Sequence, residues 1–488
     1  MQNPKHIHLI GICGTAMASL AGMLQMQGHY ITGSDAAAYP PMSDLLRGLG
    51  IPIYEPYAEC NLELRPDLVV VGNAISRGNV ELEYVLDARI PFCSMAAILH
   101  DEFLLGRESL VVAGTHGKTT TTSMLAWIYE VASWRDTALA PSFLIGGVAE
   151  NFATSFMVRP TRPFLLEGDE YDTAFFDKGP KFLHYFPDAA ILTHVEFDHA
   201  DIYADLSAVK TAFKRLVNLV PRRGRIVAFD GNENVSECVA RAFCAVERYG
   251  FGEQSHWRAT NLRHDGPLTR WTLLRCGEPF AELSLPMAGE HNALNATAAA
   301  ALAAGQGIPI EAIAEALATF KSVKRRLEVR AVVGGVTIID DFAHHPTAIR
   351  ETLRALRERY PGQRLLAVLE PRSNTLRRNV FETALVDSLG LADRVVLASV
   401  FKSESIPAHE RLVPEHVVTA LNERGVPGSV HTDADAIVAA IAPELRDGDV
   451  VAILSNGGFG GIYQKLPRAI SDSIVLRAGR TLQPRGSA

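Results

Sequence analysis

Short, unbroken runs of apolar residues alternate along the chain with longer stretches of helical periodicity. In the first hundred residues such runs are His6–Ile10, residues 30–32 and Leu68–Val71, and a helical pattern over residues 17–26 follows the first of them. Strands that are apolar at successive positions are typical of parallel sheets with helices on both faces. The pattern therefore predicts a Rossmann-like α/β unit at the amino terminus.

Two further α/β series follow the first. Their predicted strands are residues 110–113, 164–166, 190–193 and 225–229 in the second series, and 336–339, 365–369, 394–397 and 450–454 in the third. Residues 257–285 are strand-rich and charged, which indicates a small antiparallel insertion, and the alanine-rich run 293–304 predicts a helix. We place boundaries near residues 107 and 327. The predicted fold is α/β with three domains, over residues 1–107, 108–327 and 328–488.

Composition narrows the class of protein. The 488 residues are 48% apolar and 21% charged, a globular balance, and the net charge of −8 disfavours a nucleic-acid or anionic-membrane partner. Six scattered cysteines without a CxxC pair favour a reducing, cytoplasmic location. The uncharged stretch 9–26 admits a signal peptide or membrane segment as an alternative, but its glycines and polar residues favour a strand, turn and helix. Nothing in the sequence indicates an obligate protein partner.

The strongest local motif is a glycine-rich loop between a predicted strand and a predicted helix. Its residues are Gly114, Thr115, His116, Gly117, Lys118, Thr119 and Thr120. In this context backbone N–H groups and the helix N-terminus bind phosphates, Lys118 would reach the β- and γ-phosphates, and the Thr119 hydroxyl would ligate magnesium. The strict P-loop pattern has glycine where this chain has Val112, so the match is to a shorter GTxGKTT variant. The alternative is a glycine-rich turn with a solvated lysine.

Acidic and histidine residues follow the next two strands. Glu167 opens the run Glu-Gly-Asp-Glu-Tyr-Asp, and we predict that it is the first residue past its strand and a magnesium ligand. His199 follows the neighbouring strand, so we expect it near the same phosphates. The alternatives are a solvated acidic loop and a structural histidine.

The remaining candidate site residues are polar residues at the alanine-rich helix and at the second domain boundary. Asn292 and Asn295 are three residues apart on one helical face, where their amides could bind an adenine edge, although Asn also serves as a helix cap. The basic run Lys324-Arg325-Arg326 could supply a cation to the phosphates or form a solvated hinge.

Taken in order, these motifs resemble those of the Mur ligase family. The resemblance runs over nearly the whole chain through GTHGKTTT, E-x-D-E-x-D, x-E-x-DH, G-x-HN-x-x-N, RR-x-E and DD-x-x-HHPT. It implies an amino-terminal UDP-sugar domain, a central ATPase domain and a carboxy-terminal domain that helps to bind the incoming amino acid or peptide. It also implies an ATP-dependent ligase that forms an acyl phosphate and releases ADP and phosphate.

Four segments resemble one branch of the family. They are Glu170-Tyr171-Asp172, the sequence AFFDK at 174–178, LEPRSNT at 369–375 and SNGGFGG at 455–461. That branch attaches the tripeptide L-alanyl-γ-D-glutamyl-meso-diaminopimelate to UDP-N-acetylmuramate in peptidoglycan recycling, whereas L-alanine-adding members typically carry a Glu-Ser-Asp cluster and a His-Arg-Tyr motif. The nearest alternative is therefore the same chemistry with L-alanine as the amine.

The resemblance assigns a role to each matching residue. Lys118, Glu167 and His199 are the catalytic set, and Thr119, Glu167 and His199 the magnesium ligands. The remaining ATP contacts are residues 114–120 with His291, Asn292, Asn295, Arg326 and Asp341. Substrate contacts are Gly11, Gly14, Thr15 and Asp35 for the UDP-sugar and Arg372, Ser373 and Asn374 for the tripeptide, because an arginine fork suits a carboxylate-rich ligand.

The chain departs from the family pattern at a few positions. His194 stands where the family commonly has Asn, and the carbamylated lysine of some members would correspond to Lys210 or Lys214. Gly11-x-Cys13-x-x-Ala16 lacks two glycines of the dinucleotide fingerprint, which argues against a nicotinamide oxidoreductase. A non-catalytic nucleotide sensor is disfavoured because carboxylate and histidine candidates accompany the loop. We also expect the third domain to close about the segment near Arg326.

Overall fold

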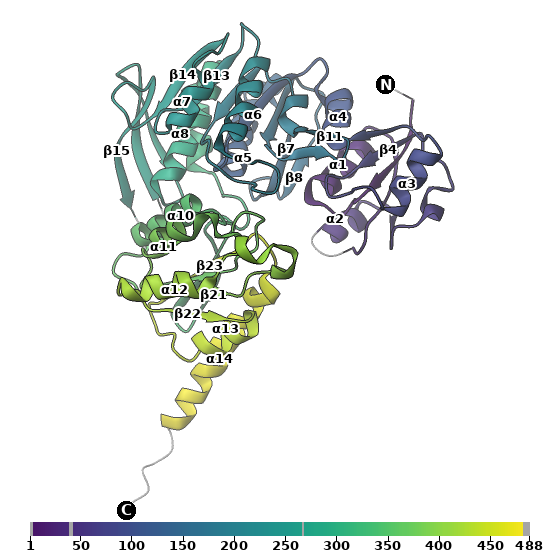
Figure 1. Cartoon of the computed structure of the whole chain (residues 1–488). Helices are drawn as coiled ribbons and strands as arrows, with labels where there is room; N and C mark the ends of the chain where they lie inside the picture. The colour runs from purple at the N-terminus through teal and green to yellow at the C-terminus, as the bar shows by residue number, and fades with distance from the viewer. Residues whose placement is uncertain (1–2, 39–41, 266–267, 482–488) are drawn as a thin grey trace, which may run out of the picture.

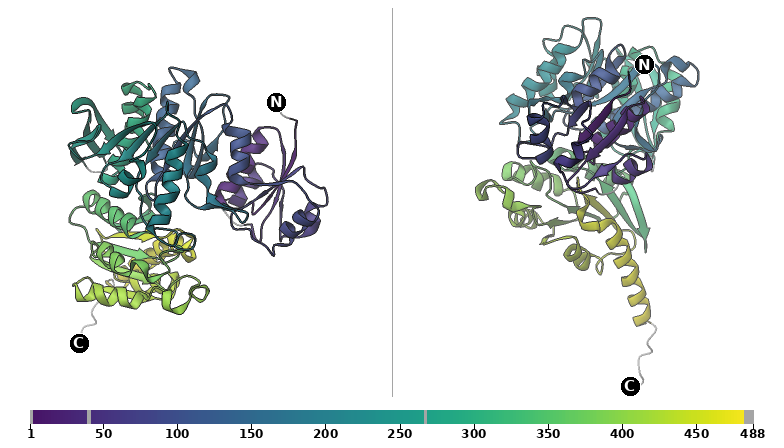
Figure 2. Two further views of the ribbon diagram at one scale, coloured as in Figure 1. Left: turned by 45° about the horizontal axis from the view of Figure 1, so that its top comes forward. Right: turned by 90° about the vertical axis from the view of Figure 1, so that its right-hand side faces the viewer.

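Residues 3–38, 42–265 and 268–481 are described by a computed structural model with three α/β domains in series (Figure 1). The first and third domains attach to different sides of the central one, as Figure 1 and the left view of Figure 2 both show. The outer ends of the predicted first and third domains, residues 1–2 and 482–488, lie outside the described residues. Among the described residues, no helix combines the length and apolarity that a membrane span requires.

The first domain is a five-stranded parallel sheet in the order β3-β2-β1-β4-β5. Its elements are β1 (His6–Ile10), α1 (Thr15–Met26), β2 (Tyr30–Ser34), α2 (Met42–Gly48), β3 (Ile53–Tyr54), β4 (Leu68–Val71), α3 (Val80–Asp87), β5 (Phe92–Ser94), α4 (Met95–Leu99) and a π-helical turn (His100–Leu104). Helix α1 packs on Ile7 and Leu9, and α3 packs on Ile10, which points to the opposite face. The predicted Rossmann-like unit is confirmed, and its crevice lies between the carboxyl ends of β1 and β4.

The central domain is built on a ten-stranded sheet in the order β17-β16-β15-β14-β13-β12-β6-β9-β7-β8. Its strands are β6 (Glu108–Ala113), β7 (Ser142–Ala149), β8 (Thr154–Met157), β9 (Pro163–Gly168), β12 (Ala189–Leu192), β13 (Arg225–Phe229), β14 (Ala245–Gly250), β15 (Trp257–Asp265), β16 (Leu268–Arg275) and β17 (Glu278–Leu285). A separate hairpin comprises β10 (Asp172–Ala174) and β11 (Asp177–Pro180). The helices are α5 (Lys118–Ser133), α6 (Leu206–Leu219), α7 (Glu233–Val239), α8 (Glu290–Gly305) and α9 (Ile310–Ala318).

The strand-rich region 257–285 is antiparallel, as predicted, but it is not a separate insertion. Strand β15 pairs in parallel with β14 through Tyr249 and Trp257, so β15–β17 extend the central sheet. The side chains of Trp257 and Trp271 are buried in the same apolar core as α8. Burial of these two large rings keeps the three strands on the main sheet.

Helices α5 and α6 cover opposite faces of the central sheet. Val112 of β6 lies in the core with α5, whereas Val111 and Ala113 lie in the core with α6. Because α5 follows β6 and α6 follows its neighbour β12, the connections diverge between these two strands. Ligands of open α/β sheets bind at such a divergence, outside the carboxyl ends of the strands.

The third domain has a six-stranded sheet in the order β18-β19-β23-β20-β21-β22, parallel except for the edge pair β18–β19. Its elements are β18 (Glu328–Val333), β19 (Val336–Asp341), α10 (Pro346–Arg359), β20 (Leu365–Leu369), α11 (Glu382–Leu389), β21 (Arg394–Ala398), α12 (Pro414–Glu423), β22 (Gly428–His431), α13 (Ala434–Ile441), β23 (Val450–Leu454) and α14 (Ile462–Thr481). Helices α10, α11 and α12 share one core, and α13 and α14 share the other. The crevice of this domain therefore opens between the ends of β20 and β23.

The predicted domain boundaries near residues 107 and 327 each lie in a segment that connects one sheet to the next. Strand β5 ends at Ser94 and β6 begins at Glu108, while β17 ends at Leu285 and β18 begins at Glu328. Short 3-10 helices complete the chain: η1 (Glu59–Leu62), η3 (Thr137–Leu139), η4 (Lys181–His184), η5 (Asn379–Phe381), η6 (Ser403–Ser405), η7 (Ala408–Glu410) and η8 (Phe459–Gly461).

Candidate functional site

The glycine-rich loop joins β6 to α5, as predicted, and two of its glycines are required by close packing. Gly114 has φ +136° and Gly117 has φ +82°, both in the region that favours glycine. A Cβ atom on Gly114 would lie 2.1 Å from Thr193 Oγ1, and one on Gly117 would lie 2.6 Å from Asn295 Oδ1. The loop is therefore held against the end of β12 and against α8, and it leads directly into the N-terminus of a 16-residue helix.

Lys118 lies in a compact ionic cluster at the carboxyl edge of the sheet. Its ammonium group donates to Gly114 O at 2.7 Å and to Glu170 Oε2 at 2.8 Å, and Glu170 Oε1 lies 3.3 Å from His199 Nε2. Burial opposes both charges of the Lys118–Glu170 pair, but their attraction outweighs it, raising the pKa of Lys118 and lowering the pKa of Glu170. Glu170 is only 2% exposed, so it links two predicted site residues from inside the protein.

Glu170 was not among the predicted site residues, although it belongs to the acidic run that drew attention to Glu167. In the sequence the two carboxylates are equivalent, since both lie near the end of a buried strand. The structure separates them. Glu170 is beyond the end of β9 and turns toward Lys118, whereas Glu167 is still part of the strand.

Glu167 and Thr119 form the second part of the site. The Thr119 hydroxyl donates to Glu167 Oε2 at 3.1 Å, and the Gly146 N–H donates to Glu167 Oε1 at 2.7 Å. The prediction that Glu167 is the first residue past its strand is wrong, because β9 continues through Gly168 by pairing with Val112 and Ala113. Burial raises the pKa of Glu167 despite the nearby Lys118, so a bound cation would stabilise its charged form.

The predicted magnesium ligands divide into two neighbouring groups. Thr119 and Glu167 are hydrogen-bonded to each other, while His199 shares a group with Asp169 and Glu170 whose ligand atoms all lie within 4.8 Å of one another. Hydroxyl and carboxylate oxygens are the ligands that Mg²⁺ prefers. Thr119 with Glu167 offers oxygen ligands alone, and the second group offers two carboxylates beside the His199 imidazole, so the oxygen atoms of both groups fit the ion.

His199 has an unusual backbone conformation for a residue with a side chain. Its φ is +56°, in the left-handed region, and its ring packs 4.1 Å from the ring of Tyr171. Burial opposes protonation, but Glu170 raises the pKa of His199 above its ordinary value. Strained backbone of this kind persists only where surrounding contacts hold it.

Residues at the front of the loop face the third domain. His116 Nε2 lies 3.1 Å from Glu196 Oε2, and its ring lies 4.5 Å from the ring of His345. The Thr115 N–H donates to His194 O at 2.7 Å, which ties the loop to the end of β12. Thr120 is buried in the first turn of α5.

The predicted adenine-side residues lie at the start of α8, beside the loop. Asn295 packs against Gly117, but the Asn292 amide donates to Ala288 O at 2.8 Å, a bond within its own helix start. His291 is half-buried, and the loss of solvent around its ring lowers its pKa, while no described residue hydrogen-bonds to its Nδ1. The N-cap of α8 is Gly289, without a side-chain cap bond, so Asn292 is not the helix cap that its sequence also allowed. Asn295 and His291 keep groups available for a ligand.

The hinge residues Arg326 and Asp341 have different surroundings. Asp341 is buried and accepts hydrogen bonds from the N–H groups of Leu327 and Ala343, at 2.8 and 2.9 Å, so its carboxylate holds the start of the third domain. The Arg326 guanidinium lies 5.3 Å from the Phe342 ring centroid, and its charge favours the ionised form of Glu167. Arg326 is thus the hinge residue whose charge acts on Glu167.

The predicted UDP-sugar residues surround the carboxyl end of β1. Gly11 has φ +82° and donates its N–H to Ser34 O at 2.9 Å, while Gly14 and Thr15 start α1. The Asp35 carboxylate accepts the Cys13 N–H at 2.9 Å, so it supports this turn. Gly11 lies at the crevice beside Gly72 and Ile75, whereas Asp35 follows β2 and supports the turn from the other side of β1.

The predicted tripeptide residues have divergent contacts. The Arg372 guanidinium packs 3.9 Å from the Phe401 ring centroid, lies 3.4 Å from Glu370 Oε1, and covers Gly457 at the end of β23. The Ser373 hydroxyl instead accepts the Leu376 N–H at 3.1 Å. Asn374 donates to Asp201 of the central domain, and its amide oxygen accepts from Arg377, both at 2.7 Å. Arg372 is therefore the member of this set that lies in the β20–β23 crevice.

Lys210 and Lys214, the two candidates for carbamylation, lie together on α6. Both donate to Glu237 of α7 at 2.6 Å. This hydrogen bond raises the pKa of Lys210, whereas carbamylation requires a neutral amine. The arrangement therefore gives no support to a carbamylated lysine at either position.

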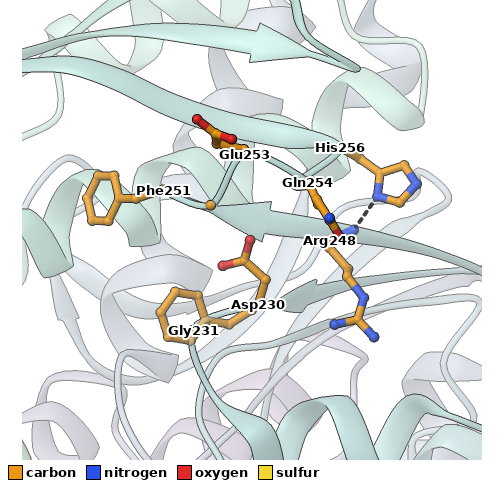
Figure 3. Close-up of a pocket in the computed structure, with 9 residues that line it drawn as sticks. Asp230, Gly231, Arg248, Phe251, Glu253, Gln254 and His256 are labelled. Atoms are coloured by element: carbon orange, nitrogen blue, oxygen red, sulfur yellow. Dashed lines mark hydrogen bonds between the residues drawn. The ribbon is translucent and has the colours of Figure 1, made fainter.

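A hollow of about 820 Å³ lies elsewhere on the central domain, at the ends of β13 and β14 (Figure 3). Asp230, Arg248, Glu253 and His256 contribute charged or polar groups to it, and the Arg248 N–H donates to His256 Nδ1 at 3.1 Å. None of the predicted site residues lines this hollow. The candidate chemistry is in the crevice between β6 and β12 instead.

Comparison with known proteins covers all three domains. Residues 6–103 match the Mur ligase family catalytic domain, residues 112–303 the Mur ligase middle domain, and residues 325–457 the Mur ligase glutamate ligase domain. The UDP-N-acetylmuramate–L-alanyl-gamma-D-glutamyl-meso-2,6-diaminoheptandioate ligase of Escherichia coli (strain K12) is 44% identical over 461 residues, which cover 94% of this chain and 97% of that protein.

Two further relatives are named for different activities. The UDP-N-acetylmuramate–L-alanine ligase of a Polaromonas species is 34% identical over 472 residues, 95% of this chain and 97% of that protein. The crystal structure of a murein peptide ligase from Psychrobacter arcticus superposes with a TM-score of 0.72 at 36% identity, covering 96% of this chain and 99% of that one. The likeness extends over the same three domains that hold the loop, the acidic cluster and the two outer crevices. This chain belongs to the Mur ligase family.

Proposed function

We propose that the protein is an ATP-dependent ligase that joins the tripeptide L-alanyl-γ-D-glutamyl-meso-diaminopimelate to UDP-N-acetylmuramate. The observation that carries the substrate assignment is the 44% identity, over nearly the full length of both chains, to the E. coli ligase that bears these substrates in its name. The relative with L-alanine as its amine is less similar, at 34%. The peptide is therefore the better-supported amine.

The chemistry that we propose has two steps. The muramate carboxylate attacks the γ-phosphorus of ATP to give an acyl phosphate and ADP, and the peptide's α-amine then attacks the acyl carbon, so that phosphate leaves. Lys118, at the N-terminus of α5, binds the phosphates and offsets the negative charge that spreads over the transferring group. Phosphoryl transfer of this kind depends on positioning and charge neutralisation rather than on a protein nucleophile.

Magnesium fits the oxygen-rich groups beside the loop. Thr119 with Glu167, and Asp169 with Glu170 and His199, would hold it. When bound, the ion would neutralise phosphate oxygens and lower the barrier to transfer. The same residues, with ATP, form the nucleotide half of the proposed site.

The amine half of the proposed site is the β20–β23 crevice. Glu370 and the Phe401 ring hold the Arg372 guanidinium there, at the point where the helices of this sheet change faces. A planar guanidinium binds carboxylates through two parallel hydrogen bonds, and the tripeptide carries several carboxylates. We propose that Arg372 binds one of them.

A phosphate-release assay tests the function. With ATP, Mg²⁺ and UDP-N-acetylmuramate, we expect release when the tripeptide is added and much less when L-alanine is added at the same concentration. If phosphate is released with L-alanine but not with the tripeptide, the amine substrate is L-alanine and the proposed substrate is wrong. If neither amine leads to phosphate release, the assignment as a ligase is wrong.

Replacing Arg372 tests the amine site separately. We expect Arg372→Ala to raise the KM for the tripeptide about 10- to 100-fold, the effect of losing hydrogen bonds between charged groups, while the KM for ATP changes little. Arg372→Lys keeps the positive charge but not the planar guanidinium with its two parallel donors, so its KM for the tripeptide should lie between those of Arg372→Ala and the unsubstituted protein. Unchanged KM values for both substrates would contradict this role of Arg372.

A further inference from the structure

The third domain contacts the segment that carries His199 through one buried threonine. The Thr375 hydroxyl donates to Asp198 Oδ1 at 2.6 Å, and it accepts the Ala200 N–H at 3.3 Å. Thr375 and Asp198 are 2% and 5% exposed. One hydroxyl from the third domain therefore contacts the residues on both sides of His199.

These contacts act on a strained position. His199 has φ +56°, and its own N–H donates to Asp198 Oδ1 at 2.7 Å, the same oxygen that Thr375 contacts. A left-handed conformation costs a residue with a Cβ free energy, so it is retained only where contacts outside the residue hold it. Thr375 supplies such contacts from another domain.

A second interdomain contact lies at the other end of the segment. Glu196 Oε2 accepts the Thr347 hydroxyl of α10 at 2.7 Å and lies 3.1 Å from His116 Nε2. Since His345 Nδ1 accepts the Thr347 N–H and its Nε2 contacts Phe197 O at 3.2 Å, both of its ring nitrogens already have protein partners. We therefore interpret His116, Glu196 and His345 as a domain contact and not as a metal site.

Thr375 also lies three residues from the proposed amine-binding arginine. Arg372 and Thr375 belong to one short loop after β20, but Arg372 covers Gly457 in the crevice whereas Thr375 is directed toward Asp198. The loop thus has one end in the amine site and the other against the His199 segment. Movement of the third domain would shift both ends together.

We propose that Thr375 is a positioning residue that holds His199 in its working conformation only when the third domain is docked. This inference rests on the proposed function. Docking of the domain that binds the peptide amine would then complete the phosphate site, so that ATP is used only when the amine can capture the acyl phosphate. Such coupling protects a reactive intermediate from water.

The kinetic test compares Thr375→Val, which removes the hydroxyl but keeps the shape, with Thr375→Ser, which keeps the hydroxyl. We expect T375V to lower kcat about tenfold or more, the size for a buried hydrogen bond to a charged group, and to leave the KM for the tripeptide unchanged. T375S should remain within about threefold of the unsubstituted protein, the ordinary scatter of conservative changes. If T375V does not fold, Thr375→Ala is measured instead, with the same expectations.

A second measurement does not depend on turnover. Hydrogen–deuterium exchange of a peptide covering residues 196–203 is followed with UDP-N-acetylmuramate, Mg²⁺ and a non-hydrolysable ATP analogue. Because the Ala200 N–H loses its acceptor, T375V should exchange faster there, whereas T375S should not. Peptides from α8 serve as the internal control.

Several outcomes would overturn the proposal. Unchanged kcat in T375V would do so, as would equal losses in T375V and T375S, or a rise in the tripeptide KM with kcat intact, which would assign Thr375 to substrate binding. Unchanged exchange in residues 196–203 would also contradict it. If the unsubstituted protein releases no phosphate with any amine, the proposed function fails, and the exchange measurement still decides whether Thr375 holds this segment.

Discussion

A Lys118→Ala protein is expected to release phosphate from ATP at least about a thousandfold more slowly than the unsubstituted chain, with either amine present. The Lys118 ammonium lies at the N-terminus of α5 and is held by Gly114 O and Glu170. A positively charged hydrogen-bond donor that is already in place, in a site with little water, stabilises a transition state that gains negative charge and accounts for a rate difference of this size. Phosphate release at saturating ATP and UDP-N-acetylmuramate measures the effect.

The control for this substitution is an exposed lysine with an equivalent ion pair. Lys465→Ala removes a contact to Asp435 on the surface of the third domain, and we expect turnover close to that of the unsubstituted protein. Circular dichroism should show that both variants keep their secondary structure. Near-normal turnover of Lys118→Ala would exclude the proposed phosphoryl transfer.

The second large effect is expected for Glu170→Gln, which retains the size of the side chain but not its charge. Glu170 is buried between Lys118 and His199, so the substitution leaves the Lys118 ammonium without its counter-charge and removes the carboxylate that raises the pKa of His199. We expect kcat to fall about 100-fold or more, and the free energy of unfolding to fall by about 3–5 kcal/mol, the cost of breaking a buried pair. Phosphate release and urea denaturation measure the two effects.

The change in stability should depend on pH. Although burial opposes ionisation, Lys118 and His199 hold the pKa of Glu170 below its ordinary value of about 4.3. A lowered folded-state pKa stabilises the protein above that ordinary value, and this contribution is lost as the pH falls through the folded-state pKa. The difference between Glu170→Gln and the unsubstituted protein should therefore be large at pH 7 and smaller at pH 3–4.

Glu237→Gln is the matched control for the buried carboxylate. Glu237 also bridges two cationic side chains, Lys210 and Lys214, but it does so at the surface. Exposed pairs contribute at most about 1 kcal/mol, so this variant should lose little stability and no activity. A Glu170→Gln protein that behaved like Glu237→Gln would contradict the role of the Lys118–Glu170–His199 cluster.

The periodicity of the chain was sufficient to predict most of the strands that build the three sheets. Strands such as β1, β4, β20 and β23 match their predicted residues because each is a short apolar run bounded by glycine or polar residues. Strand β9 was predicted too short, since its last residues, Glu167 and Gly168, are polar or small and become strand only by pairing with β6. The pattern of apolar residues within one segment does not indicate how that segment pairs with another strand.

The site was predictable to the extent that motifs fix residue type and spacing. The loop from Gly114 to Thr120 and the acidic run at the end of β9 were both identified from the sequence, since glycine, lysine and carboxylates at strand ends indicate phosphate chemistry. Which carboxylate contacts Lys118 was not predictable, because the residue at which β9 ends decides which side chain can turn toward the lysine, and the sequence did not indicate that residue. The structure brings Glu170, not Glu167, to the lysine.

By itself, then, the sequence determined the α/β class, the order of the three domains and the phosphate loop, because these depend on apolar periodicity and on local turn chemistry. Only the tertiary structure decided that Thr375 and Thr347 of the third domain contact Asp198 and Glu196 of the central one. The physical reason is distance along the chain. Contacts between residues more than a hundred positions apart depend on how whole sheets and domains pack, and a single sequence carries no periodic signal of that packing.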